Sequence, residues 1–522
     1  MIKNFKWLLL VSLTFMACNS DDEVVTVIDS SDGLPLTSGT ADFSKYVALG
    51  NSLTSGFSDG ALFIKGQQGS YTNIMAQQFK LVGGGEFKIP YTNDNIGGLL
   101  FGGQINPAFG PRLYFNGSAP VPVTGPPTTE VFNPAIPAAG PYNNTGVPGA
   151  KSFHLLSPTY GAATGLSNGT ANPYYVRFAP NGTTSVLAYA MSQTPTFFSL
   201  WIGNNDVLGY ATTGGDGTNP ITPATGAAGV GFDGTYAALV NTLTSAGAKG
   251  VVANIPYVTS IPFFKTVPYN PLTAKVLGGG NEATGTATIN ALNAQLYGPL
   301  KNALNYLGVT DRINLLSLTA ANPLLIKDES LTNLSAQLTA VLTPSVGAQT
   351  AAFYGTVFGQ ARQATATDLI LLTTQSAIGA APTAANSGLG AAPPSPLDKF
   401  GITYPLQDKY ALIPTEIAEL KVATDAFNAT IKSLADSKGL AFVDANAIMA
   451  QIDSGGIVAN NFTMASTFVT GGTFSLDGIH PSPRGYAFIA NKFIEAINIK
   501  YGSNLKGVNV GNYSILYPGS LQ

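Results

Sequence analysis

The sequence predicts an α/β protein in which a mostly parallel sheet lies between two layers of helices. Short apolar runs that end at glycine or polar residues alternate with longer amphipathic segments. This alternation implies crossover connections, which place helices on both faces of a parallel sheet. The chain has 522 residues, enough for one such domain with large insertions. We therefore expect a three-layer α/β/α sandwich that carries long inserted segments.

The first expected strand is the apolar run 46–49, which ends at Gly50. Further strands are expected at 196–202, 250–255, 312–316 and 440–444, and helices at 71–79, 236–246, 289–307, 417–438 and 485–501. Ligands of open parallel sheets bind beyond the carboxyl ends of the strands, so residues that follow strands are the first candidates for chemistry.

The amino terminus has the pattern of an export signal. Lys3 and Lys6 precede the apolar segment 7–17, which is too short to cross a membrane and matches a signal-peptide core. Cys18 follows directly and is the only cysteine, so it has no partner for an intramolecular disulfide. The arrangement resembles a bacterial lipoprotein signal, which implies a lipid on Cys18 and anchoring to the outer membrane, with exposure at the cell surface. The alternative is an ordinary secretory signal cut elsewhere.

The acidic residues at 21–23 resemble the export tag of surface lipoproteins from Bacteroidetes-type bacteria. We expect a signal peptide at 1–17, a polar tether at 18–44, one domain at 45–500 and a tail at 501–522. Insertions are expected at about 85–142, 208–231 and 256–401. The second is rich in Gly, Thr, Pro and Ala and is expected to be a loop, whereas the third has helical periodicity and is expected to form a cap.

Composition excludes some classes of partner. Lys and Arg number 25 against 28 Asp and Glu, so the chain lacks the positive surplus that binding to nucleic acid requires. Charged residues are only 10% of the chain, and such a neutral surface is more typical of exported proteins. No glycine-rich phosphate-binding motif stands between a strand and a helix, so nucleotide binding is not supported.

Histidine is the sharpest constraint on chemistry, because the chain contains only His154 and His480. They lack the spacing of a two-histidine metal site, and we expect neither a metal nor an organic cofactor. Asp477 precedes His480 by three residues, a spacing that lets a carboxylate orient an imidazole in a tight turn. His154 is the alternative base, although it also fits a packing role.

Candidates for the other roles follow strands. Ser52 lies just beyond the first strand, in Gly50-Asn51-Ser52-Leu53, where it could act as a nucleophile or merely cap a helix. Asn205, in Gly203-Asn204-Asn205-Asp206, could donate its amide to an oxyanion or form an Asx turn. Gly149 could bring a bare backbone N–H close to a substrate oxygen, or belong to a simple Pro-Gly turn.

Two other serine motifs are poor candidates. Ser167 fits G-x-S-x-G, but no apolar strand precedes it, so the context of a nucleophile elbow is absent. Ser454 lies in Asp453-Ser454-Gly455-Gly456, which resembles a trypsin-like motif without its preceding glycine. We expect both segments to have other roles.

Together these segments resemble the SGNH/GDSL hydrolase superfamily, whose blocks supply Ser, Gly, Asn and His in this chain order. The blocks are Gly50-Asn51-Ser52-Leu53, Asn144 with Gly149, Gly203-Asn204-Asn205-Asp206, and Asp477 with His480. The resemblance implies a flavodoxin-like sheet, Ser52 as nucleophile, and His480 oriented by Asp477 as base. A second core strand before Asn144 is implied as well, although no segment there has the pattern of one. It also implies an oxyanion hole made by Ser52, Gly149 and Asn205.

The resemblance implies a serine esterase or lipase of the cell envelope that hydrolyses a lipid or short-acyl ester through an acyl-enzyme. A carbohydrate esterase that removes acyl groups from a glycan is the alternative within the family. Two further alternatives are not hydrolases. One is a surface lipoprotein that keeps this scaffold and only binds a glycan or lipid, and the other is an acyltransferase. The expected partners are the ester substrate and, through Cys18, the membrane.

Overall fold

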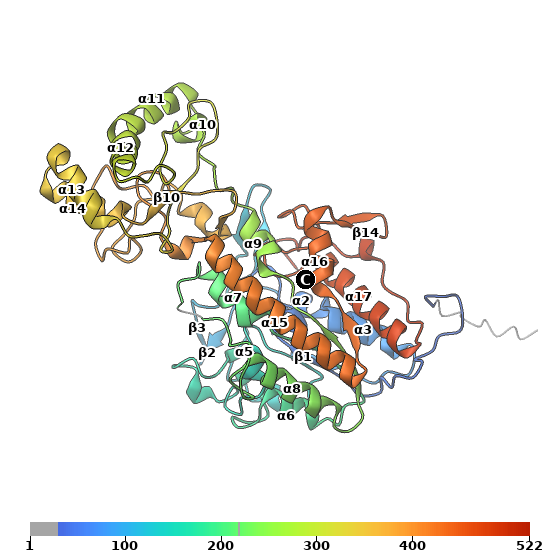
Figure 1. The fold of residues 1–522 in the computed structure, drawn as a ribbon. Coiled ribbons are helices and arrows are strands. Elements are labelled where there is room, and N and C mark those ends of the chain that lie inside the picture. Colours follow the sequence, from blue (N-terminus) through green and yellow to red (C-terminus); the bar gives the residue numbers. More distant parts are fainter. Residues whose placement is uncertain (1–29, 218–219, 522) are drawn as a thin grey trace, which may run out of the picture.

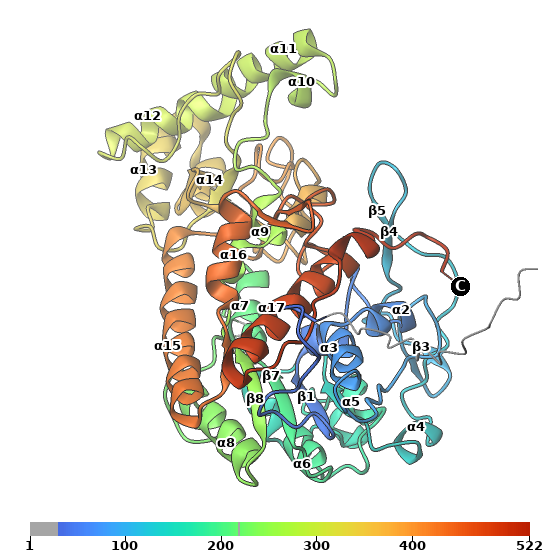
Figure 2. The same ribbon diagram turned by 90° about the vertical axis from the view of Figure 1, so that its right-hand side faces the viewer.

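The computed structural model describes residues 30–217 and 220–521, and shows a parallel sheet enclosed by helices (Figures 1 and 2). The sheet contains β1 (Tyr46–Gly50), β6 (Asn144–Gly146), β7 (Phe197–Trp201), β8 (Lys249–Ala253) and β13 (Ala441–Val443). Their spatial order is β13-β8-β7-β1-β6, and every neighbouring pair is parallel. The expected mixed α/β architecture with a parallel sheet is therefore confirmed.

The chain reverses its direction of travel across the sheet beside β1. β6 pairs on one side of β1, with Ala48 opposite Asn144, and β7 pairs on the other side, with Ala48 opposite Ser199. The connection after β1 crosses the sheet in one direction and the connection after β7 crosses it in the other. The two segments therefore separate beyond the carboxyl ends of these strands, and a crevice forms between them. Ser52 follows β1 and Asn205 follows β7, which places both at this crevice.

Helices form a layer on each face of the sheet (Figure 2). One layer contains α3 (Tyr71–Lys80) and α17 (Pro483–Tyr501), which pack against each other, and the other contains α6 (Val186–Met191), α8 (Phe232–Thr244) and α15 (Pro414–Lys438). The ends of α17 have clear signals: the Ser482 hydroxyl accepts from the Gly485 N–H, and Gly502 ends the helix in the left-handed region. Among the described residues, no helix combines the length and hydropathy that a membrane span requires.

The third predicted insertion contains its own hydrophobic core. A second buried cluster runs from Val267 to Ile413, separate from the cluster around the sheet. It includes α11 (Glu282–Leu292), α12 (Gly298–Tyr306), α13 (Ser335–Val346) and α14 (Ala348–Phe358), which stand apart from the sheet in Figure 1. We call residues 267–413 the inserted subdomain, and its end lies about a dozen residues beyond the predicted 401.

Two expectations about strands are wrong. Residues 312–316 form no strand: Arg312 accepts from the Gln363 N–H, and the Leu316 N–H donates to the Asn293 side chain within the inserted subdomain. The second core strand is β6, which begins at Asn144 itself. Its three residues, Asn-Thr-Gly, include no apolar side chain, so no hydrophobic run marks it in the sequence.

The boundaries of the predicted segments also change. The predicted insertion 208–231 begins inside α7 (Asn204–Thr212). Residues 30–44 do not form a free tether, because Phe43 is buried and the Thr40 N–H donates to the carbonyl of Tyr501. The tail beyond 501 is packed as well, since the Arg112 guanidinium donates to the Pro518 and Gly519 carbonyls. The signal peptide and Cys18 lie outside the described residues.

Candidate active site

Ser52 stands on a tight turn between β1 and the short helix α1 (Ser52–Ser55). The Asn51 side chain accepts from the Leu53 N–H and caps this helix, so Ser52 itself is not the cap. Gly50 is required at the turn, because a Cβ there would lie 2.2 Å from Thr54 Oγ1 and 2.4 Å from the Trp201 carbonyl oxygen. The turn thus leaves the Ser52 hydroxyl free for another role, in a side chain that is 7% exposed.

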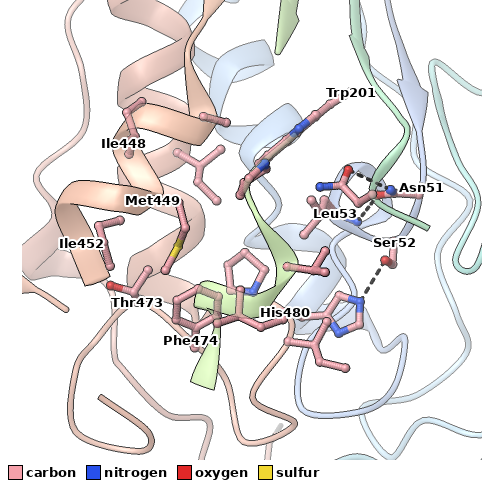
Figure 3. Close-up of a pocket in the computed structure, with 18 of the residues that line it drawn as sticks. Asn51, Ser52, Leu53, Trp201, Ile448, Met449, Ile452, Thr473, Phe474 and His480 are labelled. Carbon is pink, nitrogen blue, oxygen red and sulfur yellow. Dashed lines mark hydrogen bonds between the residues drawn. The ribbon is translucent and has the colours of Figure 1, made fainter. Parts of the chain in front are cut away.

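The Ser52 hydroxyl meets the histidine that the sequence singled out. Ser52 Oγ lies 2.8 Å from His480 Nε2, and His480 Nδ1 lies 2.8 Å from Asp477 Oδ2. An ionised Asp477 can only accept, so Nδ1 carries the proton and Nε2 is free to accept from Ser52. Ser52 and His480, 428 positions apart in the chain, are therefore hydrogen-bonded (Figure 3), and Asp477 extends this bond into a relay.

The Asp477 carboxylate is held by donors on all sides. Oδ1 accepts from the Ser475 hydroxyl and from the Ile479 and His480 N–H groups, while Oδ2 also accepts from the Gly60 N–H. Burial would raise the pKa of Asp477, but the His480 ring and these donors outweigh it and lower the pKa to about 2. The carboxylate is therefore ionised and fixed in orientation at neutral pH.

Of the three residues expected to bind an oxyanion, Ser52 and Asn205 line a pocket beside β1, and Gly149 lies in the loop that Asn205 contacts through Ala150. Asn205 Nδ2 donates one of its two protons to the Ala150 carbonyl at 2.9 Å, which leaves the second for another acceptor. Ser52 is the first residue of α1, so its N–H has no acceptor within the helix. Gly149 has φ +80°, and a Cβ on it would approach nothing closer than 3.8 Å.

Asp206 connects the two segments that carry Asn205 and Gly149. Its carboxylate accepts from both the N–H and the hydroxyl of Ser152, at 2.8 and 2.6 Å. Gly203, with φ +118°, lets the chain turn sharply from β7 into α7, and a Cβ there would lie 2.4 Å from Ile255 Cδ1. The start of α7 is thereby fixed against the loop at 149–152.

An apolar pocket opens beside Ser52 and His480 (Figure 3). It encloses about 930 Å³ of space free of protein atoms, part of it open to solvent. Its walls come from the sheet and from α16 (Ala445–Ser454) and α17, and include Trp201, Val443, Ile448, Met449, Ile452, Phe488 and Phe493. Ile448, Met449 and Ile452 lie at the side away from Ser52. Such a pocket accommodates an apolar group whose polar end lies at the Ser52 hydroxyl.

The other candidates have structural roles. His154 stacks on Tyr160, and its Nδ1 accepts from the Lys151 N–H at 3.0 Å. Burial, followed by the charge of Lys151, lowers the pKa of His154 to about 4. Ser167 lies in a turn after a short 3₁₀ helix, and Ser454 is the last residue of α16, as expected for segments without a nucleophile.

Two residues of the site were not predicted from the sequence. Phe57 packs on the His480 ring, with ring centroids 4.6 Å apart. Asp59 is 1% exposed, and its Oδ1 accepts from the Leu476 N–H just before Asp477. The turn Ser58-Asp59-Gly60 was the one available signal, and turns of this composition are common on protein surfaces.

Comparisons of the chain with protein-family models, with curated proteins and with solved structures return no significant match. The chemistry of the site is therefore inferred from its geometry.

Proposed function

We propose that this protein is a serine ester hydrolase of the SGNH/GDSL type that acts on esters of apolar acyl chains in the bacterial cell envelope. The observation that carries the proposal is the relay Ser52–His480–Asp477, with 2.8 Å at both steps, at the opening of an apolar pocket. The order of the five sheet strands, 2-1-3-4-5 when they are numbered along the chain, supports it because this is the flavodoxin-like order.

In the proposed reaction, Ser52 Oγ attacks the ester carbonyl while His480 Nε2 takes its proton. Asp477 stabilises the imidazolium that forms, and His480 then protonates the alcohol as it leaves. Water attacks the acyl-enzyme by the same route and releases the acid. The negative oxygen of each tetrahedral intermediate is bound by the Ser52 and Gly149 N–H groups and by the free Asn205 amide proton.

The pocket supports an acyl rather than a sugar group at the carbonyl side. Its walls are almost entirely hydrocarbon and aromatic, and a buried sugar would leave hydroxyl groups without partners there. Each methylene of an acyl chain that enters it contributes about 0.8 kcal/mol. We therefore favour a medium or long acyl ester over an acetylated glycan.

The test is hydrolysis of p-nitrophenyl esters from acetyl to palmitoyl by the purified protein and by its Ser52→Ala and His480→Ala variants. We expect activity to rise with chain length up to the capacity of the pocket. Each variant should lose at least about 10³-fold in kcat, because both atoms of the proton transfer are required.

Two variants serve as matched controls. His154→Asn keeps an oxygen that can accept from the Lys151 N–H, and Ser454→Ala removes a hydroxyl at the end of α16, so both should retain activity within a few-fold. A folded protein that hydrolyses none of the esters, or a Ser52→Ala variant that remains fully active, contradicts the proposal. In the first case a narrow glycan ester or a binding role becomes the better hypothesis.

Anchoring is tested separately from hydrolysis. Radiolabelled palmitate should be incorporated into the full chain expressed in a bacterial host and should be absent from a Cys18→Ala variant. Incorporation that persists in the variant, or a wild-type chain that takes up no label, contradicts lipidation at Cys18.

A further inference from the structure

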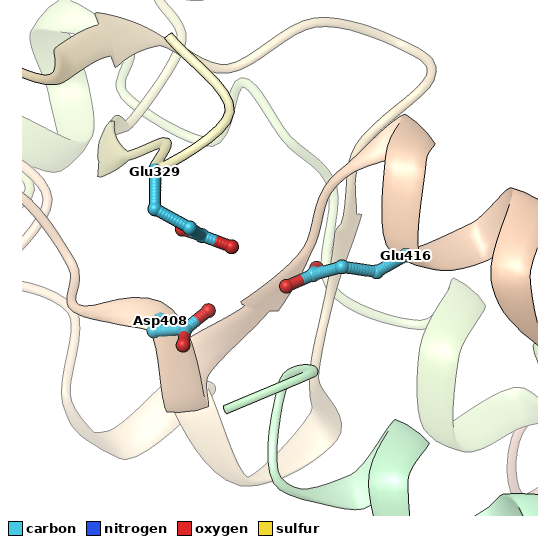
Figure 4. A group of neighbouring side chains, drawn as sticks. All are labelled: Glu329, Asp408 and Glu416. Carbon is cyan, nitrogen blue, oxygen red and sulfur yellow. The ribbon is translucent and has the colours of Figure 1, made fainter. Parts of the chain in front are cut away.

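Three carboxyl groups meet where the inserted subdomain adjoins the helical layer of α15 (Figure 4). Glu329 follows β9 (Leu325–Lys327), Asp408 begins the 3₁₀ helix η6 (Asp408–Tyr410), and Glu416 lies in the first turn of α15. One carboxylate oxygen from each lies within 4.8 Å of the other two. This cluster lies outside the pocket of Ser52, because none of the three residues lines that pocket.

Glu416 gives a second, independent sign that the cluster binds something. Its Oε2 accepts from the Ile413 N–H at 2.8 Å, as a glutamate in the first turn of a helix commonly does. Its Oε1 is buried and has no hydrogen-bond donor in the described part of the chain, in a residue only 4% exposed. The carboxylate points toward Asp408 and Glu329 (Figure 4). A buried carboxylate oxygen without a donor is costly, unless a cation or proton compensates it.

The surrounding chain supplies little compensation. Gly215, just after α7, packs so closely that a Cβ on it would lie 2.2 Å from Glu416 Oε1, and glycine has no side chain with which to donate. Lys327 is the cation that acts on Asp408, while Asp216 adds a further negative charge there. Burial, together with Glu329 and Asp408, raises the pKa of Glu416. The three acidic groups thus oppose one another's ionisation, and a bound cation would relieve that opposition.

We propose that Glu329, Asp408 and Glu416 form a Ca²⁺ site that joins the inserted subdomain to α15. The three ligands are all carboxylate oxygens, which hard cations prefer, and no histidine or cysteine takes part. Ca²⁺ binds oxygens at 2.3–2.6 Å, so oxygens within 4.8 Å of one another can ligate one ion. Ca²⁺ also accepts irregular sites, whereas Mg²⁺, at 2.0–2.1 Å, demands near-ideal octahedral geometry. Backbone carbonyls and water complete the coordination.

Because the site lies between two parts of the molecule, bound Ca²⁺ is expected to stabilise the folded state. Glu329 and Asp408 belong to the inserted subdomain and Glu416 to the helical layer, so bound Ca²⁺ links two parts of the molecule. Gly214 packs against the carbonyl oxygen of Asp408, which brings the end of α7 to the same junction. Ligands that bind only the folded state stabilise it, so the free energy of Ca²⁺ binding appears as resistance to unfolding.

The experiment measures the thermal midpoint of the chelator-treated full-length protein with 0–5 mM CaCl₂, and Ca²⁺ binding by calorimetry. We expect saturable binding near one equivalent and a rise in Tm of at least about 2 °C at saturation. MgCl₂ at the same concentrations should give a smaller shift. Neither readout involves hydrolysis, so this proposal and the proposed function succeed or fail separately.

The variants Glu329→Gln and Asp408→Asn should abolish the Ca²⁺-dependent shift. In the chelated state both should unfold at or above the wild-type temperature, because they relieve repulsion. Glu329 is exposed, so its variant will fold. Glu419→Gln is the matched control on α15, since Glu419 accepts from the Tyr210 hydroxyl outside the cluster, and it should keep the full shift. A wild-type protein without calorimetric binding or Tm shift, or variants that keep the shift, overturns the proposal.

Discussion

At the scale of single residues, Asn205 and Asn204 are neighbours that both line the pocket, and the proposed function assigns the oxyanion to Asn205. Asn205 Nδ2 has one proton engaged by the Ala150 carbonyl and one free. Asn204 instead accepts from Asn51 Nδ2 at 3.2 Å, so it supports the turn that carries Ser52. We expect Asn205→Ala to lower kcat by about 10²–10³ with little change in KM, because the lost hydrogen bond forms mainly in the transition state.

Steady-state kinetics on the best p-nitrophenyl ester will measure this effect. Asn204→Ala is the matched control, and its kcat should fall by less than about 10-fold, because the proposed donor is Asn205 and the variant removes the acceptor of Asn51 Nδ2. If kcat falls equally in the two variants, the prediction that Asn205 is the specific donor to the oxyanion is contradicted.

The buried carboxyl group of Asp59 is expected to make the free energy of unfolding depend on pH. Burial and the charge of Asp477 raise the pKa of Asp59 to about 7, although the Leu476 N–H and Arg112 act to lower it, and Asp59 also faces Tyr517. A carboxyl group whose pKa is higher in the folded state binds more protons there than in the unfolded chain. Its contribution is therefore present below pH about 4 and is lost as the pH rises from about 4 to 7.

We expect Asp59→Asn to remove this loss, since Asn has no charge to bury and can still accept from the Leu476 N–H. The free energy of unfolding, measured in urea at pH 5 and pH 8, should differ less in the variant than in the wild type. A variant whose stability changes with pH as steeply as that of the wild type would show that Asp59 is not the responsible group.

The same residues show how far sequence reasoning reaches. Ser52, Asp477 and His480 could be proposed because two histidines in the whole chain leave few choices for a base, and each motif follows a strand or precedes a helix. Asp59 could not be proposed, because its burial depends on contact with residues more than 400 positions away. A local pattern does not contain that information.

At the scale of secondary-structure elements, the sequence predicts long elements better than short ones. The helices expected at 417–438 and 485–501 appear as α15 and α17, with ends that differ by three residues or fewer. The expected helix 289–307 appears as α11 and α12 joined by a π-helical turn at Asn293–Tyr297. β6 escaped prediction because a three-residue strand has no measurable periodicity.

If the pocket binds an acyl chain, residues of α16 are expected to determine which chain length it prefers. Ile448, Met449 and Ile452 line the pocket away from Ser52, so the far end of a long chain reaches them and an acetyl group does not (Figure 3). We expect Met449→Trp to fill part of the pocket and to lower kcat/KM for the palmitoyl ester by at least about 10-fold. Activity on the acetyl ester should change less than about 3-fold.

The measurement is kcat/KM across the ester series. Val422→Trp is the matched control, because Val422 is 70% exposed on α15 and does not line the pocket. A uniform loss across all chain lengths in Met449→Trp would indicate a general disturbance of α16 rather than a wall of the acyl pocket.

At the scale of the whole molecule, the loop that carries Asp477 and His480 lies where the two hydrophobic cores meet. The Gly478 carbonyl accepts from the N–H of Phe263, which is buried in the core around the sheet, and a Cβ on Gly478 would lie 3.0 Å from Leu372 of the inserted subdomain. The uneven spacing of the expected elements predicted that an insertion exists in this region. Its contact with the loop could not be predicted, since packing between distant segments leaves no periodic pattern.

Two separate cores imply two units that can open independently. Leu338 in α13 is fully buried in the inserted subdomain and lines no part of the pocket. Leu338→Ala should cost about 2–5 kcal/mol within that core. Amide hydrogen exchange should therefore accelerate across α13, α14 and β9, while β1, β7 and β8 keep their protection and short-chain ester hydrolysis is retained. Acceleration by the same factor in the central strands would instead mean that the molecule unfolds as one cooperative unit.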